Sequence, residues 1–439
     1  MKSPLLAALG RYLDKKRERL HMPGHKGLLP TPLDGCAPFD VTELPDTGCL
    51  YDGEGAPVET EALFSNLYGS GATLLSAGGS TLCIQAMLAL HCPEGSKVLM
   101  TRAAHHAAVN AAAVLNLEPV WLSPDEITGV QTPARISPQA VEAALLQNPG
   151  VSAVYLTSPD YFGTLCDIKA ISAIAHSHGK PLLVDNAHGA HLIFFDNLHP
   201  IALGVDACCD SLHKTLPALT GAALLHLKDG TLADEARRRM ATFGSTSPSY
   251  LVMLSADLLL PQWEVLKSSY TALAQSVAQL RSLALEKGIW ATCANLQAPV
   301  DPVRISLLFA EGQRDTALSL LQDCGIEAEY LSPRHIVLIP GPQNNLTPVE
   351  KLIAHLPALH EAPSLSLPVH QPQHLLPLRR AVLSPAERLS LLDALGRIAA
   401  APVSPCPPGV ALLMPGEILD QTTATTLKSA GITSLFVVK

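Results

Sequence analysis

The chain has 439 residues, of which 48% are hydrophobic and 16% charged, and its formal net charge is −9 at pH 7. This composition excludes a disordered chain, and the negative charge argues against a nucleic acid or an anionic membrane as partner. No apolar run approaches the roughly 18 residues of a membrane span, and the first residues lack a signal sequence, so we expect a cytoplasmic protein of two or three domains.

The ten cysteines and seventeen histidines are the candidate metal ligands. The cysteines are scattered and show no spacing typical of a metal site, so reduced thiols are expected. The closest histidine pairs are His105 with His106 and His188 with His191. We expect no metal site.

The chain begins with a helix and a turn. Apolar residues at near-helical spacing predict an amphipathic helix over residues 1–20, with Lys and Arg side chains at its end. The sequence HMPGHKG at residues 21–27 then ends the helix, because a Pro-Gly pair favours a turn.

A second turn, GGST at residues 78–81, directly precedes the helical pattern LCIQAMLAL. Such a turn exposes backbone N–H groups at the positive end of a helix dipole, where they can hold a phosphate. Gly79, Ser80 and Thr81 are therefore candidate phosphate-binding residues. The alternative is that Ser80 or Thr81 serves only as a helix N-cap.

Strands and helices alternate through the middle of the chain. A strand, a helix and a strand lie within residues 97–122, and a further set follows within residues 151–185. This alternation predicts an α/β fold with a parallel sheet and crossover helices. Helices are also expected around residues 234–240 and 262–287, followed by a strand, a helix and a strand within residues 301–340.

The strongest chemical pattern follows two apolar strands. One strand ends at Asp185, and a second, residues 207–209, leads into the sequence SLHK that ends at Lys214. Ligands bind at such strand ends in open α/β sheets, and a lysine there can form a Schiff base. Pyridoxal phosphate needs a lysine for its aldehyde and an acid for its ring nitrogen. Lys214 and Asp185 therefore predict a pyridoxal phosphate site, whose phosphate could accept hydrogen bonds from Ser211 and His213.

The same residues resemble a known family. DNAHGAH at residues 185–191 and SLHKTLPALTGA at residues 211–222 are similar to segments of the Orn/Lys/Arg decarboxylase family, fold-type I enzymes that use pyridoxal phosphate. Further motifs resemble that family in the same order, namely HMPGHKG, GGST, RAAH at 102–105, STSPSY at 245–250 and PGE at 415–417. The resemblance covers essentially the whole chain and fits a short form of the family without an N-terminal wing domain.

The resemblance implies a domain organisation. The large α/β domain, residues 40–290, would have the aminotransferase-like fold with a mostly parallel sheet and would bind the cofactor. An N-terminal helix and arm, residues 1–39, would precede it. A small α/β domain at 291–361, a linker at 362–378 and a C-terminal α+β domain at 379–439 would follow.

The resemblance also implies roles for single residues. His105 would lie flat against the cofactor ring, Ala187 would pack under the ring, and His188 would contact the substrate or carry a proton. Thr246 and Ser247 would reach the phosphate of a neighbouring subunit, so a homodimer with shared active sites is expected. For His105 the alternative is an ordinary histidine at a helix start.

A cationic substrate side chain needs an acidic partner. Glu417 of the PGE motif is the leading candidate and Glu329 the second, and His25 of HMPGHKG would approach the active site. The alternative for Glu417 is a surface residue that caps the next helix. The chain departs from the family where the family commonly has Ser, Glu and Tyr, at Ala107, Asn186 and Cys406.

The activity implied is decarboxylation of lysine, ornithine or arginine to the corresponding amine and CO₂, a reaction of polyamine biosynthesis. Lys214 would anchor the aldehyde, and Lys214 or His188 would return a proton to the product. Two alternatives stay open. One is another fold-type I reaction, an aminotransferase or a lyase, and the other is a paralogue that binds the cofactor without catalysis.

Overall fold

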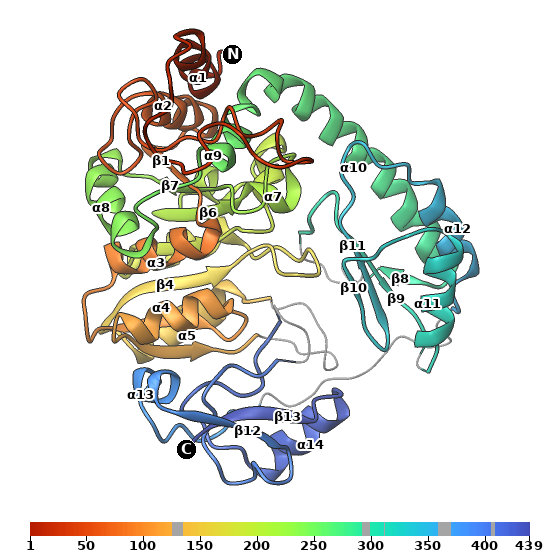
Figure 1. The fold of residues 1–439 in the computed structure, drawn as a ribbon. Coiled ribbons are helices and arrows are strands. Elements are labelled where there is room, and N and C mark those ends of the chain that lie inside the picture. Colours follow the sequence, from red (N-terminus) through yellow and green to blue (C-terminus); the bar gives the residue numbers. More distant parts are fainter. Residues whose placement is uncertain (125–134, 292–298, 311, 359–369, 405–408) are drawn as a thin grey trace. The chain divides into compact units, whose positions relative to one another are not determined.

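The computed structural model describes residues 1–124, 135–291, 299–310, 312–358, 370–404 and 409–439 (Figure 1). They form two compact units, a first unit of residues 1–91 and 181–268 and a second unit of residues 92–180 and 269–439. Helix α10 (Trp263–Glu286) belongs in part to each. Cys406 and the first part of the predicted linker, residues 362–369, lie outside the described residues.

Four neighbouring strands form the sheet of the first unit. Their order is β1 (Ala72–Ser76), β7 (Ala223–Leu227), β6 (Ala207–Ser211) and β5 (Leu182–Asp185). Strand β7 is antiparallel to both β1 and β6, whereas β5 is parallel to β6. Strands β1, β6 and β5 therefore point the same way, and their carboxyl ends share one edge of the sheet. Strand β6 extends two residues beyond its predicted end at residue 209, so Ser211 belongs to the strand.

Helices cover both faces of this sheet. Helix α2 (Ala56–Tyr68) packs on β1, and α3 (Gly79–His91) packs on β6 and β7 and against α8 (Ala233–Phe243) (Figure 1). The remaining helices of the unit are α7 (Leu212–Thr215), α9 (Tyr250–Asp257) and the short 3₁₀ segments η1 (Ala190–Phe194), η2 (Pro200–Leu203), η3 (Gly230–Leu232) and η4 (Leu260–Gln262).

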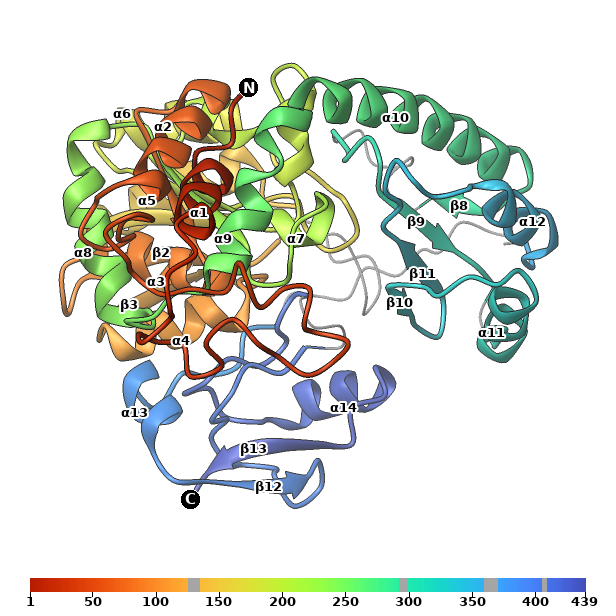
Figure 2. The ribbon, with the colours of Figure 1, turned by 45° about the horizontal axis from the view of Figure 1, so that its top comes forward.

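Helix α1 (Pro4–Asp14) is shorter than the helix predicted over residues 1–20. Asp257 holds its first turn by accepting hydrogen bonds from the Ser3 hydroxyl and the Leu6 N–H. The helix ends early because Lys16 adopts a left-handed conformation, with φ 46°, which an α-helix cannot continue. Its buried face packs against α2 and α9 (Figure 2).

The second unit contains the predicted parallel strands. Strand β2 (Lys97–Thr101) lies between β4 (Val151–Thr157) and β3 (Glu118–Leu122), and both pairings are parallel. The connecting helices are α4 (His106–Val114), α5 (Pro138–Gln147) and α6 (Ile168–Ser177). The alternation of strand and helix read from the sequence is therefore confirmed.

A separate antiparallel sheet follows in the second unit, where a small α/β domain was predicted. Its order is β10 (Tyr330–Leu331), β11 (His335–Leu338), β9 (Ile305–Leu308) and β8 (Trp290–Ala291). Helices α11 (Arg314–Asp323) and α12 (Thr347–His355) lie on one side of this sheet (Figure 1).

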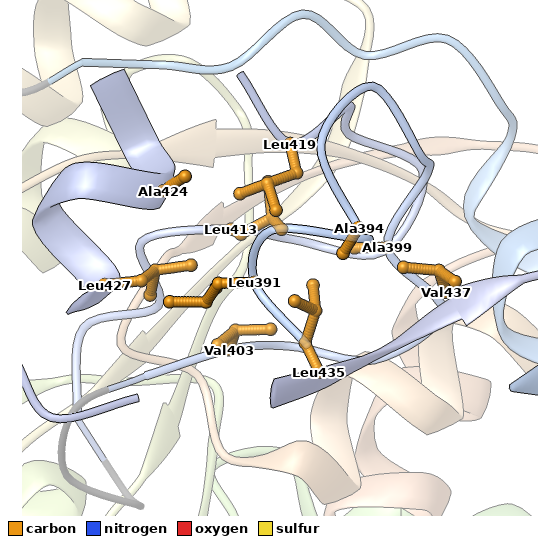
Figure 3. Packing of buried hydrophobic residues seen from close by; sticks show 10 residues of the cluster. All are labelled: Leu391, Ala394, Ala399, Val403, Leu413, Leu419, Ala424, Leu427, Leu435 and Val437. Atoms are coloured by element: carbon orange, nitrogen blue, oxygen red, sulfur yellow. The ribbon is translucent and has the colours of Figure 1, made fainter. Parts of the chain in front are cut away.

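The C-terminal part has its own apolar core. Its elements are α13 (Leu378–Leu383), β12 (Ala386–Ser390), α14 (Gln421–Ser429) and β13 (Ser434–Val438), with β12 and β13 paired antiparallel. Ten buried residues between Leu391 and Val437 form one cluster (Figure 3). Helix α13 packs on α4, the helix that begins beside His105.

The fold is α/β, as predicted, with a large domain whose strands pair mostly in parallel. Among the described residues, no helix is both long and apolar enough to span a membrane. The cysteines of the described ranges are free thiols, as expected. The domain boundaries drawn from the sequence stay predictions.

Candidate active site

Three predicted site segments meet at one edge of the sheet of the first unit. Ser76, at the end of β1, and Ser211, at the end of β6, both pair with Ala223 of the intervening strand β7. They therefore lie two strand spacings apart, roughly 10 Å. Asp185, at the end of β5, pairs with Cys209 of β6. The GGST turn, the SLHK segment and Asp185 thus follow strand ends at the same edge.

The GGST turn has the geometry of an anion site. Helix α3 begins at Gly79, whose φ of 67° favours glycine. The Gly79 N–H donates to the Gly221 carbonyl (2.8 Å), and the Ser76 hydroxyl donates to the Gly79 carbonyl (3.0 Å). The next N–H groups, from half-buried Ser80 and exposed Thr81, have no acceptor within the helix. The turn is therefore fixed with its donors available, as anion binding requires.

Ser211 fits a bound phosphate. Its Oγ is fully buried and has no hydrogen-bond partner in the described structure. A buried hydroxyl without a partner costs about 1–3 kcal/mol, and a phosphate oxygen would supply the missing partner. His213 is less suited, because its Nδ1 donates to the Ala222 carbonyl (3.0 Å). In the neutral ring Nε2 is then an acceptor, so only the imidazolium could donate to a phosphate.

Asp185 is buried beside donors that orient it. Its Oδ1 accepts hydrogen bonds from the Ala187 N–H (3.1 Å) and from the Cys209 thiol (3.7 Å). Burial first, and then the charge of Asp185, raises the pKa of Cys209 well above its ordinary value, so the thiol stays a donor. The same contact fixes Ala187, the residue predicted to pack under the cofactor ring. A buried, oriented carboxylate of this kind suits a protonated ring nitrogen.

Lys214 and His188 form a close pair. Lys214 lies in α7, directly after β6, and His188 follows β5. Lys214 Nζ is 3.0 Å from Nε2 of His188, whose side chain is buried. An ammonium can only donate, so Nε2 is the acceptor when Lys214 is charged, and the ring proton is then on Nδ1. The two side chains can therefore exchange a proton between Nζ and Nε2.

Three further predicted residues lie elsewhere in the first unit. His25 accepts a hydrogen bond from the Gly27 N–H at Nδ1 (3.0 Å) and pairs through Nε2 with Asp40 (3.2 Å). Thr246 and Ser247 are exposed, in the loop between α8 and α9. Their predicted roles are untested by these contacts.

His105 and Glu329 belong to the second unit. His105 is the N-cap of α4, where its Nδ1 accepts the Ala107 N–H (3.1 Å). This contact agrees with the alternative drawn for it, a histidine at a helix start, and its role on the cofactor ring stays a prediction. Glu329 is exposed and accepts the Tyr161 hydroxyl at Oε1 (2.9 Å).

Glu417 is neither a surface residue nor a helix cap, so that alternative was wrong. Only 3% of its surface is exposed, and Asp420 caps α14 instead. Arg102 donates to both carboxylate oxygens of Glu417, at 2.6 and 2.8 Å, and the Met414 N–H donates to Oε2 (2.7 Å). Glu417 thus holds a buried cation of its own chain, and its predicted role toward a substrate cation stays a prediction.

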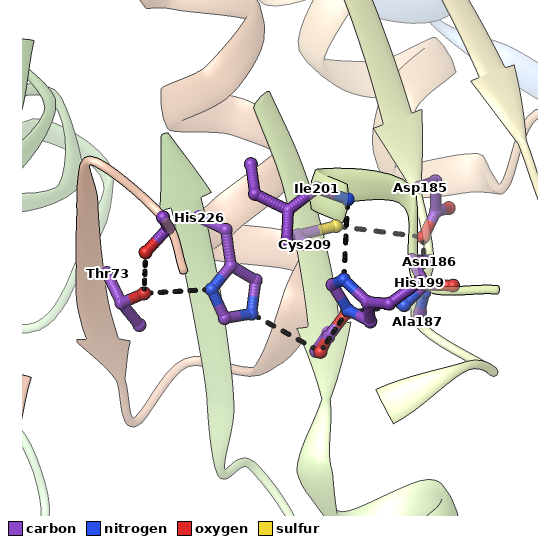
Figure 4. Close-up of polar contacts among 10 residues, drawn as sticks. Thr73, Asp185, Asn186, Ala187, His199, Ile201, Cys209 and His226 are labelled. Atoms are coloured by element: carbon purple, nitrogen blue, oxygen red, sulfur yellow. Dashed lines mark hydrogen bonds and ion pairs between the residues drawn. The ribbon is translucent and has the colours of Figure 1, made fainter. Parts of the chain in front are cut away.

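The sequence reading missed a buried polar cluster centred on Asp210 (Figure 4). Asp210 accepts hydrogen bonds from His199 (3.0 Å), His226 (3.3 Å) and the Asn186 amide (2.6 Å). Burial raises the pKa of Asp210, but the two histidines outweigh burial and lower it below its usual range. Burial lowers the pKa of His226. One signal was available, since an acid within the apolar strand sequence ACCDS needs buried partners.

The cluster could also be read as a metal site, because His199, Asp210 and His226 converge. Both Nε2 atoms, however, lie within hydrogen-bond distance of the same carboxylate. Each Nδ1 also has a partner, the Ile201 N–H at 3.4 Å for His199 and the Thr73 hydroxyl at 2.9 Å for His226. Neutral rings donating through Nε2 satisfy all of these contacts.

A strand-end lysine, a buried carboxylate and an anion-binding turn at one edge of an α/β sheet define a pyridoxal-phosphate enzyme of the aminotransferase-like class. Residues 3–272 match the family model of the Orn/Lys/Arg decarboxylase major domain, and residues 365–430 match that of its C-terminal domain. The chain therefore belongs to the Orn/Lys/Arg decarboxylase family, and with that family it is a decarboxylase of basic amino acids.

Individual relatives and solved structures are similar to this chain over most of its length. The uncharacterized protein YaaO of Bacillus subtilis is 28% identical over 97% of this chain and 94% of its own length. An arginine decarboxylase of the same organism is 25% identical, with 95% and 91% covered. Lysine decarboxylase A from Pseudomonas aeruginosa superposes with a TM-score of 0.80 at 16% identity, over 99% of this chain and 80% of that one. The Francisella novicida lysine decarboxylase gives 0.79 at 15% identity, over 100% and 81%. At such identities the solved structures establish the fold alone.

Proposed function

We propose that this protein decarboxylates lysine, ornithine or arginine, and that Lys214 holds pyridoxal phosphate for this reaction. The observation that carries the proposal is the pair of Lys214 Nζ and His188 Nε2, 3.0 Å apart, beside the strand end that bears Asp185. When bound, pyridoxal phosphate supplies an aldehyde for a lysine amine and a ring that accepts electrons from the reacting carbon. The product amine would enter polyamine biosynthesis, and the proposed location is the cytoplasm.

Different residues would bind the phosphate, the ring nitrogen and the ring of the cofactor. The N–H groups of Ser80 and Thr81, at the start of α3, and the buried Ser211 hydroxyl, which has no hydrogen-bond partner in the described structure, would bind the phosphate. Asp185 would keep the ring nitrogen protonated, since a buried carboxylate favours a neighbouring cation. By resemblance to the family, Ala187 and His105 would pack against the ring.

Lys214 and His188 would supply the proton that replaces CO₂. The ammonium form of Lys214 donates to His188 Nε2, and its neutral form can accept from a protonated imidazole. Either atom can thus hold the proton beside the reacting carbon, and the burial of His188 limits competition from water. A positioned acid of this kind contributes about 10²- to 10⁴-fold in rate.

The cationic end of the substrate would be met by Glu329 in place of Glu417. Glu329 is exposed and gives one oxygen to the Tyr161 hydroxyl, whereas Glu417 is buried against Arg102. His25 stays a proposed neighbour of the substrate on the strength of its motif.

The first test is Lys214→Ala. With the amine gone, the purified variant should lose the visible absorbance of lysine-bound pyridoxal phosphate and should release no CO₂ from lysine, ornithine or arginine. Lys169→Ala, which changes an exposed lysine in the first turn of α6, is the control and should behave like wild type. Activity of Lys214→Ala close to wild type would refute the assignment. Comparing CO₂ release from the three amino acids identifies the substrate.

A further inference from the structure

The Asp210 cluster lies on the face of the sheet opposite the candidate cofactor site. Side chains of consecutive strand residues point to opposite faces, so Asp210 points away from Cys209 and Ser211 on β6. His226 of β7 pairs with Cys208 of β6 and with Thr73 of β1, which places it on the same face as Asp210. The buried network therefore lies on one face of these strands, and Asp185, Cys209 and Ser211 lie on the other face.

Asn186 connects the two faces. It follows Asp185 directly, its backbone N–H donates to the Cys209 carbonyl (3.0 Å), and its side-chain amide donates to Asp210 (2.6 Å). Two hydrogen bonds thus attach the end of β5 to the end of β6. Asn186 directly follows Asp185, the proposed partner of the ring nitrogen, and Asp210 directly precedes Ser211, a proposed phosphate ligand.

The contact with Asp210 explains why residue 186 is an amide. Oδ1 of Asn186 is buried and has no hydrogen-bond partner in the described structure, so the side chain is not held in place through its oxygen. Nδ2 donates to Oδ1 of Asp210, and the charge of that carboxylate strengthens the hydrogen bond. The two histidines hold the carboxylate in place by donating to it as well. A carboxylate at 186, as in the family motif, would meet the charge of Asp210, and two carboxylates this close cannot both ionise.

We propose that Asn186 and Asp210 are positioning residues that fix the distance between the ring-binding Asp185 and the phosphate- and lysine-bearing end of β6. The proposal rests on the proposed function, since it assigns the pair a role in cofactor binding. The histidines His199 and His226 act through Asp210, by holding its carboxylate in place. None of these side chains needs to touch the cofactor.

The experiment measures the dissociation constant of pyridoxal phosphate for cofactor-free protein. Asn186→Asp should weaken binding about 10- to 100-fold, because a charge-assisted bond becomes a repulsion, and Asp210→Asn should weaken it as well. The exchanged pair Asn186→Asp with Asp210→Asn restores one donor and one acceptor, so it should recover most of the lost affinity. Asn197→Asp, at an exposed position in the same connection, adds the same charge and should change nothing.

A second variant separates positioning from plain stability. Asn186→Ala removes the donor together with the orphaned oxygen, so its thermal unfolding temperature without cofactor should stay close to wild type while its affinity falls several-fold. The proposal would be overturned if a variant lost stability but, under conditions where it is folded, bound pyridoxal phosphate as tightly as wild type. Equal losses of affinity in the single variants and the exchanged pair would also overturn it. If wild type binds no pyridoxal phosphate, the proposed function fails. The unfolding free energies of wild type, Asn186→Asp, Asp210→Asn and the exchanged pair then still decide whether the two residues interact.

Discussion

At the scale of the residue, the proposed cofactor site depends on which groups stabilise two buried carboxylates. Asp185 and Asp210 are both fully enclosed acids, but their partners differ. Asp210 accepts hydrogen bonds from His199 and from the Asn186 amide, and Asp185 accepts them from the Ala187 N–H and the Cys209 thiol. Asp185 lies at the end of β5, at the sheet edge that carries the SLHK segment, and a buried carboxylate there favours a neighbouring cationic ring nitrogen.

Asp185→Asn tests this role directly. The amide can still accept from the Ala187 N–H, so the local fold should survive, but it carries no charge to hold a proton on the ring nitrogen. We expect kcat to fall by about 10- to 100-fold or more, with a smaller change in KM, since a charge-assisted interaction worth about 1.5–3 kcal/mol is lost. Steady-state kinetics on the best of the three amino acids gives both values. An unchanged kcat would show that Asp185 is not the ring partner.

At the scale of the element, the sequence predicted what local pattern determines. The strands before Asp185 and Lys214 and the turn before α3 follow from short apolar runs and glycine placement, and each is present. Long-range pairings were not predictable in this way. Arg102 and Glu417 are 315 positions apart, and no periodicity links them. The sequence shows only that each charged residue stands next to an apolar run. This indicates that each has a partner of opposite charge, but it does not identify that partner.

The Arg102–Glu417 pair attaches the C-terminal elements to the end of β2. Arg102 Nε also donates to the Ala411 carbonyl (3.0 Å), and the Ala411 N–H donates back to the Arg102 carbonyl (2.9 Å). Arg102 begins the RAAH segment, so the C-terminal part braces the turn that leads to His105. The PGE and RAAH motifs are thus halves of one contact.

Glu417→Gln should therefore lower stability more than it alters substrate recognition. Removing one partner of a buried ion pair costs about 3–5 kcal/mol, whereas Arg102→Met with Glu417→Met removes both charges and should cost less. Glu387→Gln, which breaks an exposed pair with Arg397, is the control and should cost less than about 1 kcal/mol. Urea unfolding gives the free energy of unfolding of wild type and of these three variants. Unaltered stability with a KM raised only for cationic amino acids would return Glu417 to the substrate site.

The small antiparallel sheet carries a pH-dependent contribution to stability at His335. Burial first, and then the charge of Arg334, lowers the pKa of His335 from 6.5 to about 4. As the pH falls below 6.5 the unfolded chain binds a proton that the folded chain does not. The contribution is therefore complete above pH 6.5 and lost progressively towards pH 4, by about 3 kcal/mol in all.

Replacing His335 by leucine should remove this pH dependence. The difference in unfolding free energy between wild type and His335→Leu should change by about 3 kcal/mol between pH 7 and pH 4, wild type losing more. His355→Gln, at an exposed histidine of α12, serves as control and should follow wild type. Parallel curves for wild type and His335→Leu would mean that His335 titrates normally in the folded chain.

At the scale of the whole molecule, one loop is the segment on which the proposed shared active site depends. The loop between α8 and α9 is held at its C-terminal end, because Ser249 caps α9 by accepting the Val252 N–H and the Tyr250 hydroxyl donates to the Gly48 carbonyl. Just before this end Thr246 and Ser247 are exposed. An ordered loop that presents two hydroxyls to solvent suits a donor set for a phosphate in a neighbouring subunit, as the family resemblance implies.

Hybrid dimers test this arrangement. Lys214→Ala and the double variant Thr246→Ala with Ser247→Ala should each be inactive or severely impaired, but a mixed dimer forms one intact site from the lysine of one chain and the hydroxyls of the other. Random mixing in equal amounts makes half of the dimers mixed, each with one of two sites intact, so about a quarter of wild-type activity should return. Mixing Lys214→Ala with Asp185→Asn is the matched control, since both changes fall in the part of the site supplied by one chain and no hybrid site is intact. Equal recovery in both mixtures, or a monomeric mass for the active wild-type enzyme in sedimentation, would contradict a shared site, because neither result can arise when each phosphate is bound across the dimer interface.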